Sequence, residues 1–364
     1  MNNEHKRNNI KGILSFVLLF LIFILFVLCN ILVFYSMNTK ADNSGQTVSK
    51  VSNDTIASDK VNLNEFCVEI YVKGKNDKNY NIASGTVISE DGYIVTNDHI
   101  YKDLSEPEFL IKFNDGNCYN ASYIGGDIKS DIALLKVDIN NLNCPEIYDS
   151  DKCEKGENIS ILGNIFYEDL GFTLTSGVIS HTNRYINDNG DYSIKLFQFD
   201  ASVNPGFSGG PVFNSENKLI GITNCKLNVE GYESIGFCIP INTVVEVAEE
   251  IKKFGAVISR GKLGISYIYI KENEAIMFNE VSGLRINDIE LASSFFNSGI
   301  EKNDVIRSIN SIEVSDDYKF LDILNNLKYN QDVELVIRKT EGNDVVIKGK
   351  SIKLNSKSSF YSNE

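Results

Sequence analysis

The 364-residue chain has few of the side chains that most often carry catalysis or bind metal. It contains only three histidines, and none of its seven cysteines forms a C-x-x-C pair, so the usual zinc-ligand spacing is missing and we expect no metal site. It also lacks any stretch rich in Lys and Arg, and its net charge of −14 is spread along the chain. We therefore expect no nucleic-acid partner.

Charge is missing altogether from residues 12–39, and residues 13–35 are almost entirely Leu, Ile, Phe and Val. A helix of this length, at ~1.5 Å per residue, can cross a hydrocarbon core of ~30 Å. Basic residues precede the segment in excess, which places residues 1–11 in the cytoplasm and the rest of the chain outside the membrane. The pattern predicts a single-pass anchor over 12–37. The alternative is a cleaved signal peptide, whose apolar core spans only ~7–15 residues.

Composition predicts that the remainder of the chain is divided into a linker, two folded domains and a tail. Residues 38–60 are polar and predict a flexible linker, whereas the 43% hydrophobic content of the chain suffices for two or three folded domains. We expect one domain at 61–256, a second at 261–354, and a polar tail at 355–364.

Short apolar runs separated by Gly, Asn and Asp fill the first domain, and they predict an all-β sandwich or barrel. The clearest predicted strands are Phe66–Val72, Gly85–Ser89, Tyr93–Thr96 and Ile132–Val137. Helical periodicity appears at 242–254, with Asn242 as a possible cap and Gly255 as a stop, and again at Asp317–Leu327 in the second domain.

Six cysteines lie outside the apolar segment. An even number in an exported protein permits disulfides, and the sequence leaves their pairing open.

The segment from Gly206 to Pro211 carries a serine, Ser208, between glycines. Such a turn can bring backbone N–H groups together beside the hydroxyl, as an oxyanion hole requires. Taken alone, a glycine-rich turn that holds a serine is more often plain loop structure. A nucleophilic serine also needs a base, and histidine suits proton transfer near neutral pH.

The three histidines differ in their surroundings. His5 precedes the apolar segment, and His181 stands among polar residues where a solvated surface side chain is the plainer interpretation. His99 follows a predicted strand at a turn, which favours it as the base. Asp131 opens an apolar strand and can orient the imidazole; Asp98 is a rival carboxylate, but its adjacency to His99 makes facing geometry awkward.

Five segments together resemble the HtrA (DegP-like) serine proteases, and the resemblance covers about residues 63–354. They are Ala83–Ile88, Thr96–His99, Ser130–Lys136, Leu162–Asn164 and Asn204–Pro211. The resemblance implies a chymotrypsin-like double β-barrel, so that the fold class is mainly β, followed by a C-terminal PDZ domain of the α+β type.

The family mechanism makes Ser208 the nucleophile, His99 the base and Asp131 its orienting group, with the backbone N–H groups of Gly206 and Ser208 as the oxyanion hole. It requires no metal or organic cofactor. Phe207 departs from the family, which commonly has a small polar residue immediately before the serine, and its ring could reshape the oxyanion turn.

In the second domain, Leu263, Gly264 and Ile265 are similar to the loop with which HtrA-type PDZ domains hold a peptide carboxylate. Residues 298–310 also look like a segment of that domain. Residues 293–297 lack the family's usual Pro and Ala, so we expect the helix there to be altered.

The predicted anchor places the chain at the membrane with its folded domains outside the cytoplasm, and the resemblance implies an endopeptidase that degrades unfolded or misfolded proteins in quality control and stress response. Its PDZ domain would bind peptide C-termini, and it would assemble as a homotrimer or a higher oligomer. The alternative is a catalytically idle chaperone or adaptor with the same fold.

Overall fold

The computed structural model describes residues 61–354 apart from 75–79, 102–103, 105, 166–170, 189–190, 193 and 226–233. The predicted cytoplasmic segment, anchor, linker and C-terminal tail all lie outside the described residues. Within the described part, none of the helices combines the length and the apolar character that crossing a membrane requires.

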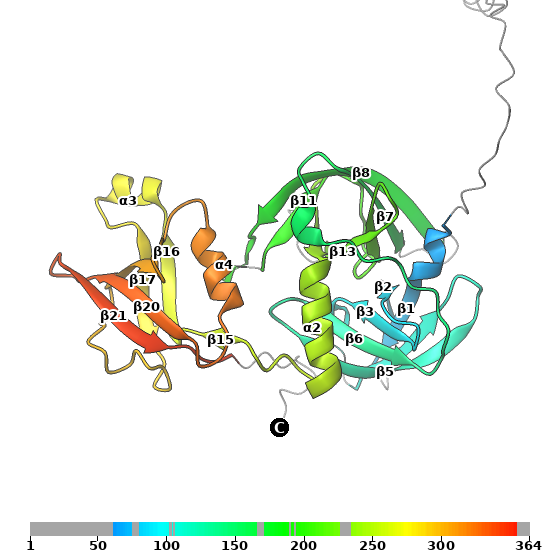
Figure 1. Cartoon of the computed structure of the whole chain (residues 1–364), viewed down its shortest axis with the longest axis horizontal. Coiled ribbons are helices and arrows are strands. Elements are labelled where there is room, and N and C mark those ends of the chain that lie inside the picture. Colours follow the sequence, from blue (N-terminus) through cyan, green and yellow to red (C-terminus); the bar gives the residue numbers. More distant parts are fainter. Residues whose placement is uncertain are drawn as a thin grey trace, which may run out of the picture. The chain divides into compact units, whose positions relative to one another are not determined.

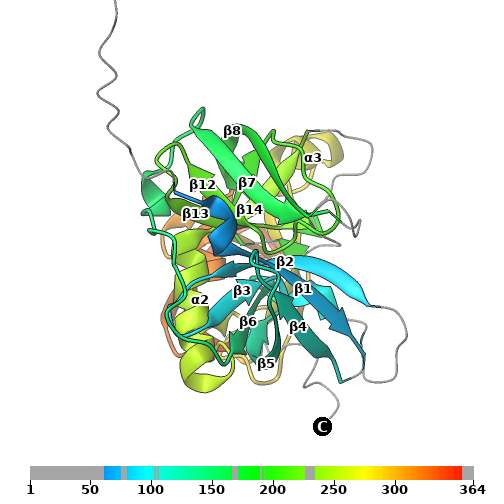
Figure 2. The ribbon, with the colours of Figure 1, turned by 90° about the vertical axis from the view of Figure 1, so that its right-hand side faces the viewer.

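Six antiparallel strands close the first barrel, in the order β1-β2-β3-β6-β5-β4 (Figures 1 and 2). They are β1 (Cys67–Lys73), β2 (Asn81–Val87), β3 (Tyr93–Thr96), β4 (Glu108–Lys112), β5 (Cys118–Asp127) and β6 (Ile132–Val137). Buried β-branched and aromatic side chains such as Ile70, Ile94 and Phe109 fill its interior. The four predicted strands correspond to β1, β2, β3 and β6; β2 starts four residues earlier than predicted and ends before Ser89.

The second barrel has the order β11-β14-β13-β12-β7-β8. Its strands are β7 (Asn158–Asn164), β8 (Phe172–Arg184), β11 (Leu196–Phe199), β12 (Pro211–Asn214), β13 (Leu219–Thr223) and β14 (Gly236–Pro240), with a small hairpin of β9 (Asn187–Asp188) and β10 (Asp191–Tyr192) inserted before β11. Every residue of β12, β13 and β14 is buried, because the two barrels pack against each other and against a helix.

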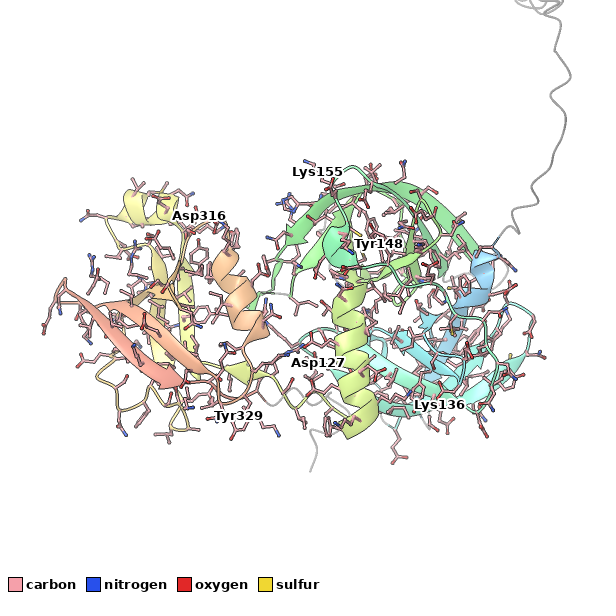
Figure 3. The ribbon with its side chains drawn as sticks, in the orientation of Figure 1. Asp127, Lys136, Tyr148, Lys155, Asp316 and Tyr329 are labelled. Carbon is pink, nitrogen blue, oxygen red and sulfur yellow. The ribbon has the colours of Figure 1, made fainter. Side chains whose placement is uncertain are left out.

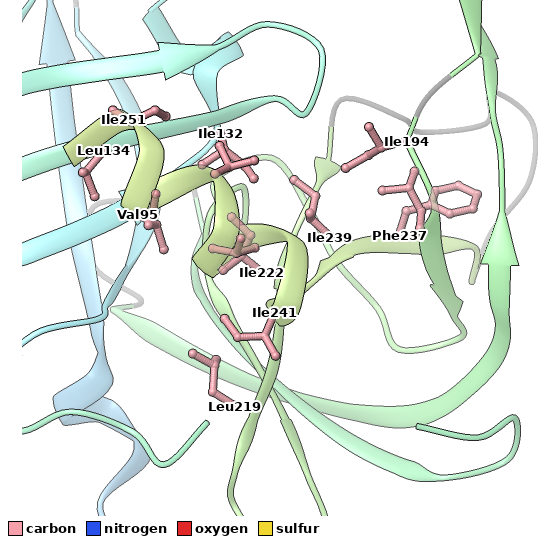
Figure 4. Close-up of a cluster of buried hydrophobic side chains, with 14 of the residues drawn as sticks. Val95, Ile132, Leu134, Ile194, Leu219, Ile222, Phe237, Ile239, Ile241 and Ile251 are labelled. Carbon is pink, nitrogen blue, oxygen red and sulfur yellow. The ribbon is translucent and has the colours of Figure 1, made fainter. Parts of the chain in front are cut away.

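That helix, α2 (Ile241–Phe254), packs on both barrels (Figure 4). Its buried face, which includes Ile251, contributes to one cluster with Ile132 of the first barrel and Ile239 of the second. Full burial of each such side chain contributes about 1.5–3 kcal/mol. The helix ends at Gly255, as predicted, with φ +73° and its N–H bonded to the carbonyl of Ile251.

The predicted cap of α2 is wrong. Pro240 is the N-cap, and Asn242 lies inside the first turn, where its side-chain oxygen accepts from the N–H of Ser150 at 3.2 Å. Proline fits here because its φ is already near the helical value and it has no N–H to satisfy.

The C-terminal domain is a sheet in the order β16-β17-β18-β20-β21, with β19 beside β18 and a separate pair of β15 and β22. Its elements are β15 (Gly261–Lys262), β16 (Ile265–Ile270), α3 (Glu272–Phe278), β17 (Gly283–Ile289), β18 (Val305–Ile309), β19 (Ile312–Glu313), α4 (Lys319–Asn326), β20 (Asp332–Arg338), β21 (Asp344–Lys350) and β22 (Ile352–Lys353). The predicted helix Asp317–Leu327 corresponds to α4. Residues 293–297 form turns instead of a helix, with Phe295 fully buried in the domain core.

Candidate active site

Three segments from the two barrels bring His99, Asp131 and Ser208 together. His99 lies on the 3-10 turn η2 (Asp98–Tyr101), directly after β3. Asp131 immediately precedes β6, and Ser208 lies in the loop before β12. The first barrel therefore supplies the imidazole and the carboxylate, and the second supplies the hydroxyl.

The imidazole of His99 lies between the other two groups. Its Nδ1 is 2.7 Å from Asp131 Oδ2, and its Nε2 is 3.2 Å from Ser208 Oγ. The backbone N–H of His99 donates to Asp131 Oδ1 at 2.9 Å. An ionised carboxylate only accepts hydrogen bonds, so Nδ1 carries the proton and Nε2 is left to accept from the hydroxyl of Ser208.

Burial separates this arrangement from an ordinary surface pair. Asp131 and Ser208 are 7% and 6% exposed, and the His99 side chain is 21% exposed. Water therefore competes weakly for the hydrogen bonds, while part of the His99 side chain remains exposed.

Asp131 has φ +56°, a left-handed conformation that is unfavourable for an aspartate. Its carbonyl accepts from Asn97 Nδ2 at 3.0 Å. The turn before it is held by Asp127, labelled in Figure 3, whose carboxylate accepts from the N–H of Ser130 at 2.9 Å and also bonds the hydroxyl of Ser130 and the guanidinium of Arg260. These contacts offset the cost of the strained backbone at the residue that orients the imidazole.

The loop that carries Ser208 is a succession of tight turns. The N–H of Phe207 donates to Asn204 O at 3.0 Å, and the N–H of Gly210 donates to Phe207 O at 2.9 Å. Gly206 and Gly209 have φ of +105° and +83°, which glycine adopts without a Cβ penalty.

Beside the Ser208 hydroxyl, the N–H groups of Gly206 and Ser208 have no acceptor among the described residues. The Phe207 carbonyl is turned toward Gly210, so the N–H of Ser208, in the same peptide unit, points the opposite way. Both donors are consistent with the oxyanion hole predicted from the sequence.

The ring of Phe207 does not enter this region. It is fully buried and belongs to the core cluster of the second barrel, together with Ile161 and Val212. A Cβ on Gly163 would lie 2.4 Å from the ring, so the absence of a side chain at position 163 makes room for it.

The rival residues lie elsewhere. Asp98 is buried and accepts a hydrogen bond from the hydroxyl of Tyr101. His181, in β8, accepts from the N–H of Asn183 at 2.9 Å, and its pKa is lowered first by burial and then by Arg184 and Lys155.

Cys225 was not singled out from the sequence, but it borders the site. Burial raises the pKa of its thiol to about 11, and a hydrogen bond with the Ser208 side chain opposes that shift. In the described structure all six cysteines outside the apolar segment are free thiols, so the disulfides that the sequence permitted are not formed.

Ser84 was also missed, although its segment was recognised. Its N–H donates to Ser208 O at 2.9 Å and its hydroxyl donates to Gly206 O at 2.7 Å. A small hydroxyl residue beside a glycine in a strand was the only sequence signal.

The predicted carboxylate loop lies at the start of β16, which is the end strand of its sheet. Gly264 has φ +69°, and Leu263 and Ile265 are buried on either side of it. Tyr269 of β16 packs on Phe320 of α4, with ring centroids 5.2 Å apart. An end strand beside a helix is the arrangement on which PDZ domains bind peptides.

Comparison with known families assigns both domains. Residues 83–222 match the trypsin-like peptidase domain, and residues 261–355 match the PDZ domain.

No group of three or more metal-binding side chains occurs in the part of the chain that the structure describes.

Several curated relatives bear the name probable periplasmic serine endoprotease DegP-like. The protein of Halomonas elongata is 32% identical over 279 residues, which cover 76% of this chain and 57% of that protein. The protein of Rickettsia prowazekii is 35% identical over 268 residues, covering 72% and 52%. This chain thus spans little more than half the length of these relatives.

Solved structures match over the same region. The HtrA-type protease AlgW with a tripeptide has a TM-score of 0.66 and 27% identity, and the match covers 80% of this chain and 94% of that one. The serine endoprotease from Yersinia pestis has a TM-score of 0.62 and 26% identity, with 80% and 95% covered. Because both domains match in sequence and the barrels have the expected arrangement, the chain belongs to the HtrA (DegP-like) family of trypsin-like serine proteases that carry a C-terminal PDZ domain.

Proposed function

We propose that this chain is a serine endopeptidase that cleaves unfolded proteins, with Ser208 as nucleophile, His99 as general base and acid, and Asp131 as the group that orients His99. The observation that carries the proposal is the position of His99, with one ring nitrogen 2.7 Å from a carboxylate oxygen and the other 3.2 Å from a hydroxyl. That hydrogen-bonded series activates a serine that would otherwise be a weak nucleophile.

Each step follows from the geometry. Ser208 Oγ attacks the scissile carbonyl as its proton passes to His99 Nε2, and the imidazolium that forms is stabilised by Asp131, which remains ionised. The carbonyl oxygen gains negative charge, which the N–H groups of Gly206 and Ser208 stabilise. His99 then gives the proton to the leaving amine, and water hydrolyses the acyl-enzyme by the same route in reverse.

The proposed location and partners are supported by the sequence pattern of residues 12–37 and by the C-terminal domain. Residues 12–37 would anchor the chain, with the peptidase domain outside the membrane and residues 1–11 in the cytoplasm. The loop at Leu263–Ile265 would bind peptide C-termini beside β16, and the chain would work as a homotrimer or higher oligomer in removing misfolded proteins.

The proposed topology can be tested by digesting intact spheroplasts with an added protease. The digestion should remove the peptidase domain and spare a cytoplasmic marker; protection of the peptidase domain would contradict a location outside the membrane.

The direct test compares the full chain with Ser208→Ala on unfolded casein. Removing a member of a cooperating triad lowers kcat by about 10⁶, so the variant should leave casein intact. Equal cleavage by both proteins would defeat the mechanism. A wild-type protein that binds casein without cleaving it would instead support the idle chaperone or adaptor.

A further inference from the structure

Strand β2 of the first barrel holds the nucleophile loop of the second barrel. The N–H of Ser84 donates to Ser208 O at 2.9 Å, the hydroxyl of Ser84 donates to Gly206 O at 2.7 Å, and the hydroxyl of Thr86 donates to Gly209 O at 2.9 Å. One strand therefore fixes three carbonyls of the loop, and the conformation of the loop depends on a neighbouring barrel.

The Ser84 hydroxyl has two acceptors within reach, the carbonyl of Gly206 at 2.7 Å and the buried thiol of Cys67. The same oxygen accepts from the N–H of Asn164 at 2.8 Å, and a backbone N–H can only donate. A hydroxyl has a single proton, and a carbonyl oxygen accepts more strongly than thiol sulfur, so the proton goes to the carbonyl of Gly206. Ser84 is fully buried, so no water is at hand to replace this donor.

The contact fixes a peptide unit next to the proposed oxyanion hole. The Gly206–Phe207 peptide is held at its oxygen by Ser84 and at its N–H by Asn204 O, 3.0 Å away. The N–H of Gly206 belongs to the preceding peptide and shares with it only the Cα of Gly206, where φ is +105°. Glycine rotates freely at that atom. The N–H of Gly206 therefore keeps its orientation only while the Gly206–Phe207 peptide is held in place.

We propose that Ser84 is a positioning residue for the oxyanion hole, acting through the carbonyl of Gly206. The inference rests on the proposed peptidase function. Without the Ser84 hydroxyl, the Gly206 carbonyl loses its donor, and rotation at Gly206 turns the N–H away from the position of the oxyanion. The loss falls on the transition state and not on substrate binding, because the oxygen is negative only after attack.

The test compares two hydroxyl deletions on the same strand in the full chain, Ser84→Ala and Thr86→Val, with dye-labelled unfolded casein as substrate. Deleting an oxyanion donor costs about 10²–10³ in kcat, and since Ser84→Ala leaves the donors present but unfixed, we expect a loss of about 10–100-fold with little change in KM. Thr86→Val removes a comparable buried hydrogen bond, as thermal unfolding can check, yet should lower kcat less because Gly209 contributes no oxyanion donor. Equal losses in the two variants would overturn the proposal.

A second readout needs no protein substrate. An alkyl fluorophosphonate reacts as Ser208 Oγ displaces fluoride from phosphorus and the hydroxyl proton passes to His99, while negative charge gathers on the phosphoryl oxygen in the oxyanion hole. We expect Ser84→Ala to slow this labelling by about the same factor as kcat. If the wild type is labelled but leaves casein intact, the proposed function fails while the role of Ser84 is still measured.

Labelling of folded Ser84→Ala at the wild-type rate would refute the role of Ser84. Should that variant unfold, Ser84→Cys takes its place, because a thiol occupies the same position as a weaker donor. It should be labelled more slowly than wild type, and an unchanged rate would again be contrary.

Discussion

Replacing Asp131 with asparagine should leave the fold intact and remove nearly all activity. Both carboxylate oxygens contact His99, one through Nδ1 at 2.7 Å and the other through the backbone N–H at 2.9 Å. An amide has one accepting oxygen, and a backbone N–H cannot become an acceptor. The amide oxygen must therefore face the backbone, and its NH₂ group must face Nδ1.

That orientation reverses the tautomer of His99. Nδ1 has to accept, so the proton moves to Nε2, which can then no longer take the proton of Ser208. A wrong tautomer in a triad of this geometry costs about 10⁴ in kcat, equivalent to about 5.4 kcal/mol of transition-state stabilisation. The loss should appear in kcat, with KM little changed, because the imidazole does not hold the substrate.

The assay is steady-state cleavage of dye-labelled casein by purified wild type, Asp131→Asn and Asp98→Asn, with thermal unfolding as the check on folding. Asp98→Asn is the matched control: it makes the same change in a buried carboxylate near His99 that bonds Tyr101 and not the imidazole ring, and should stay close to wild type. A folded Asp131→Asn that keeps a tenth or more of wild-type kcat would show that Asp131 does not set the tautomer.

Three further predictions concern packing, a buried charge and a thiol. Gly163→Ala places a Cβ 2.4 Å from the ring of Phe207 and should lower the free energy of unfolding by about 1–3 kcal/mol through overpacking, measured by urea denaturation. Lys339→Met removes the ammonium partner of the fully buried Asp304 and should cost about 3–5 kcal/mol, because the carboxylate loses its counter-charge and keeps only hydrogen bonds such as those from the N–H groups of Glu301 and Thr340. The pKa of Cys225 is about 11, so its alkylation by iodoacetamide should be slow at neutral pH and should speed up as the pH rises toward that value, since the thiolate is the reactive form.

Each of these has an outcome that contradicts it. A Gly163→Ala variant as stable as wild type would mean that the ring has room to move. Lys348→Met, which breaks a largely exposed pair with Glu334, should lower the free energy of unfolding by at most about 1 kcal/mol. A loss as large as that of Lys339→Met would show that the burial of Asp304 does not cause the larger effect. Alkylation of Cys225 as fast at neutral pH as that of the exposed Cys118 would contradict the raised pKa.

The local spacing of apolar residues was enough to predict much of the secondary structure. Helix α2 was predicted at 242–254 from apolar spacing and begins one residue earlier, and β3 and β6 have their predicted bounds. These elements are long or strongly patterned, so a few residues carry the signal. The cap of α2 and the missing helix at 293–297 were harder, because capping and short turns depend on contacts with distant segments.

The candidate catalytic residues were likewise easier to predict from the sequence than the residues that hold them in position. His99 and Ser208 stand out because the chain has few histidines and a serine between glycines. Ser84 does not, because nothing in a strand sequence shows which loop its hydroxyl will contact across 122 residues of chain. The position of the Phe207 ring could not be foreseen either, since it depends on the space left by Gly163.

The sequence by itself determined which residue types were available for the chemistry, the β-rich pattern of the first domain and the family resemblance. Only the tertiary structure decided that the imidazole lies between Asp131 and Ser208, that Asp98 and His181 are turned to other partners, and that β2 holds the loop that carries Ser208. Composition and periodicity act over a few residues, whereas hydrogen-bond geometry is set when two barrels close and pack against each other. Side chains more than one hundred residues apart then lie within about 3 Å.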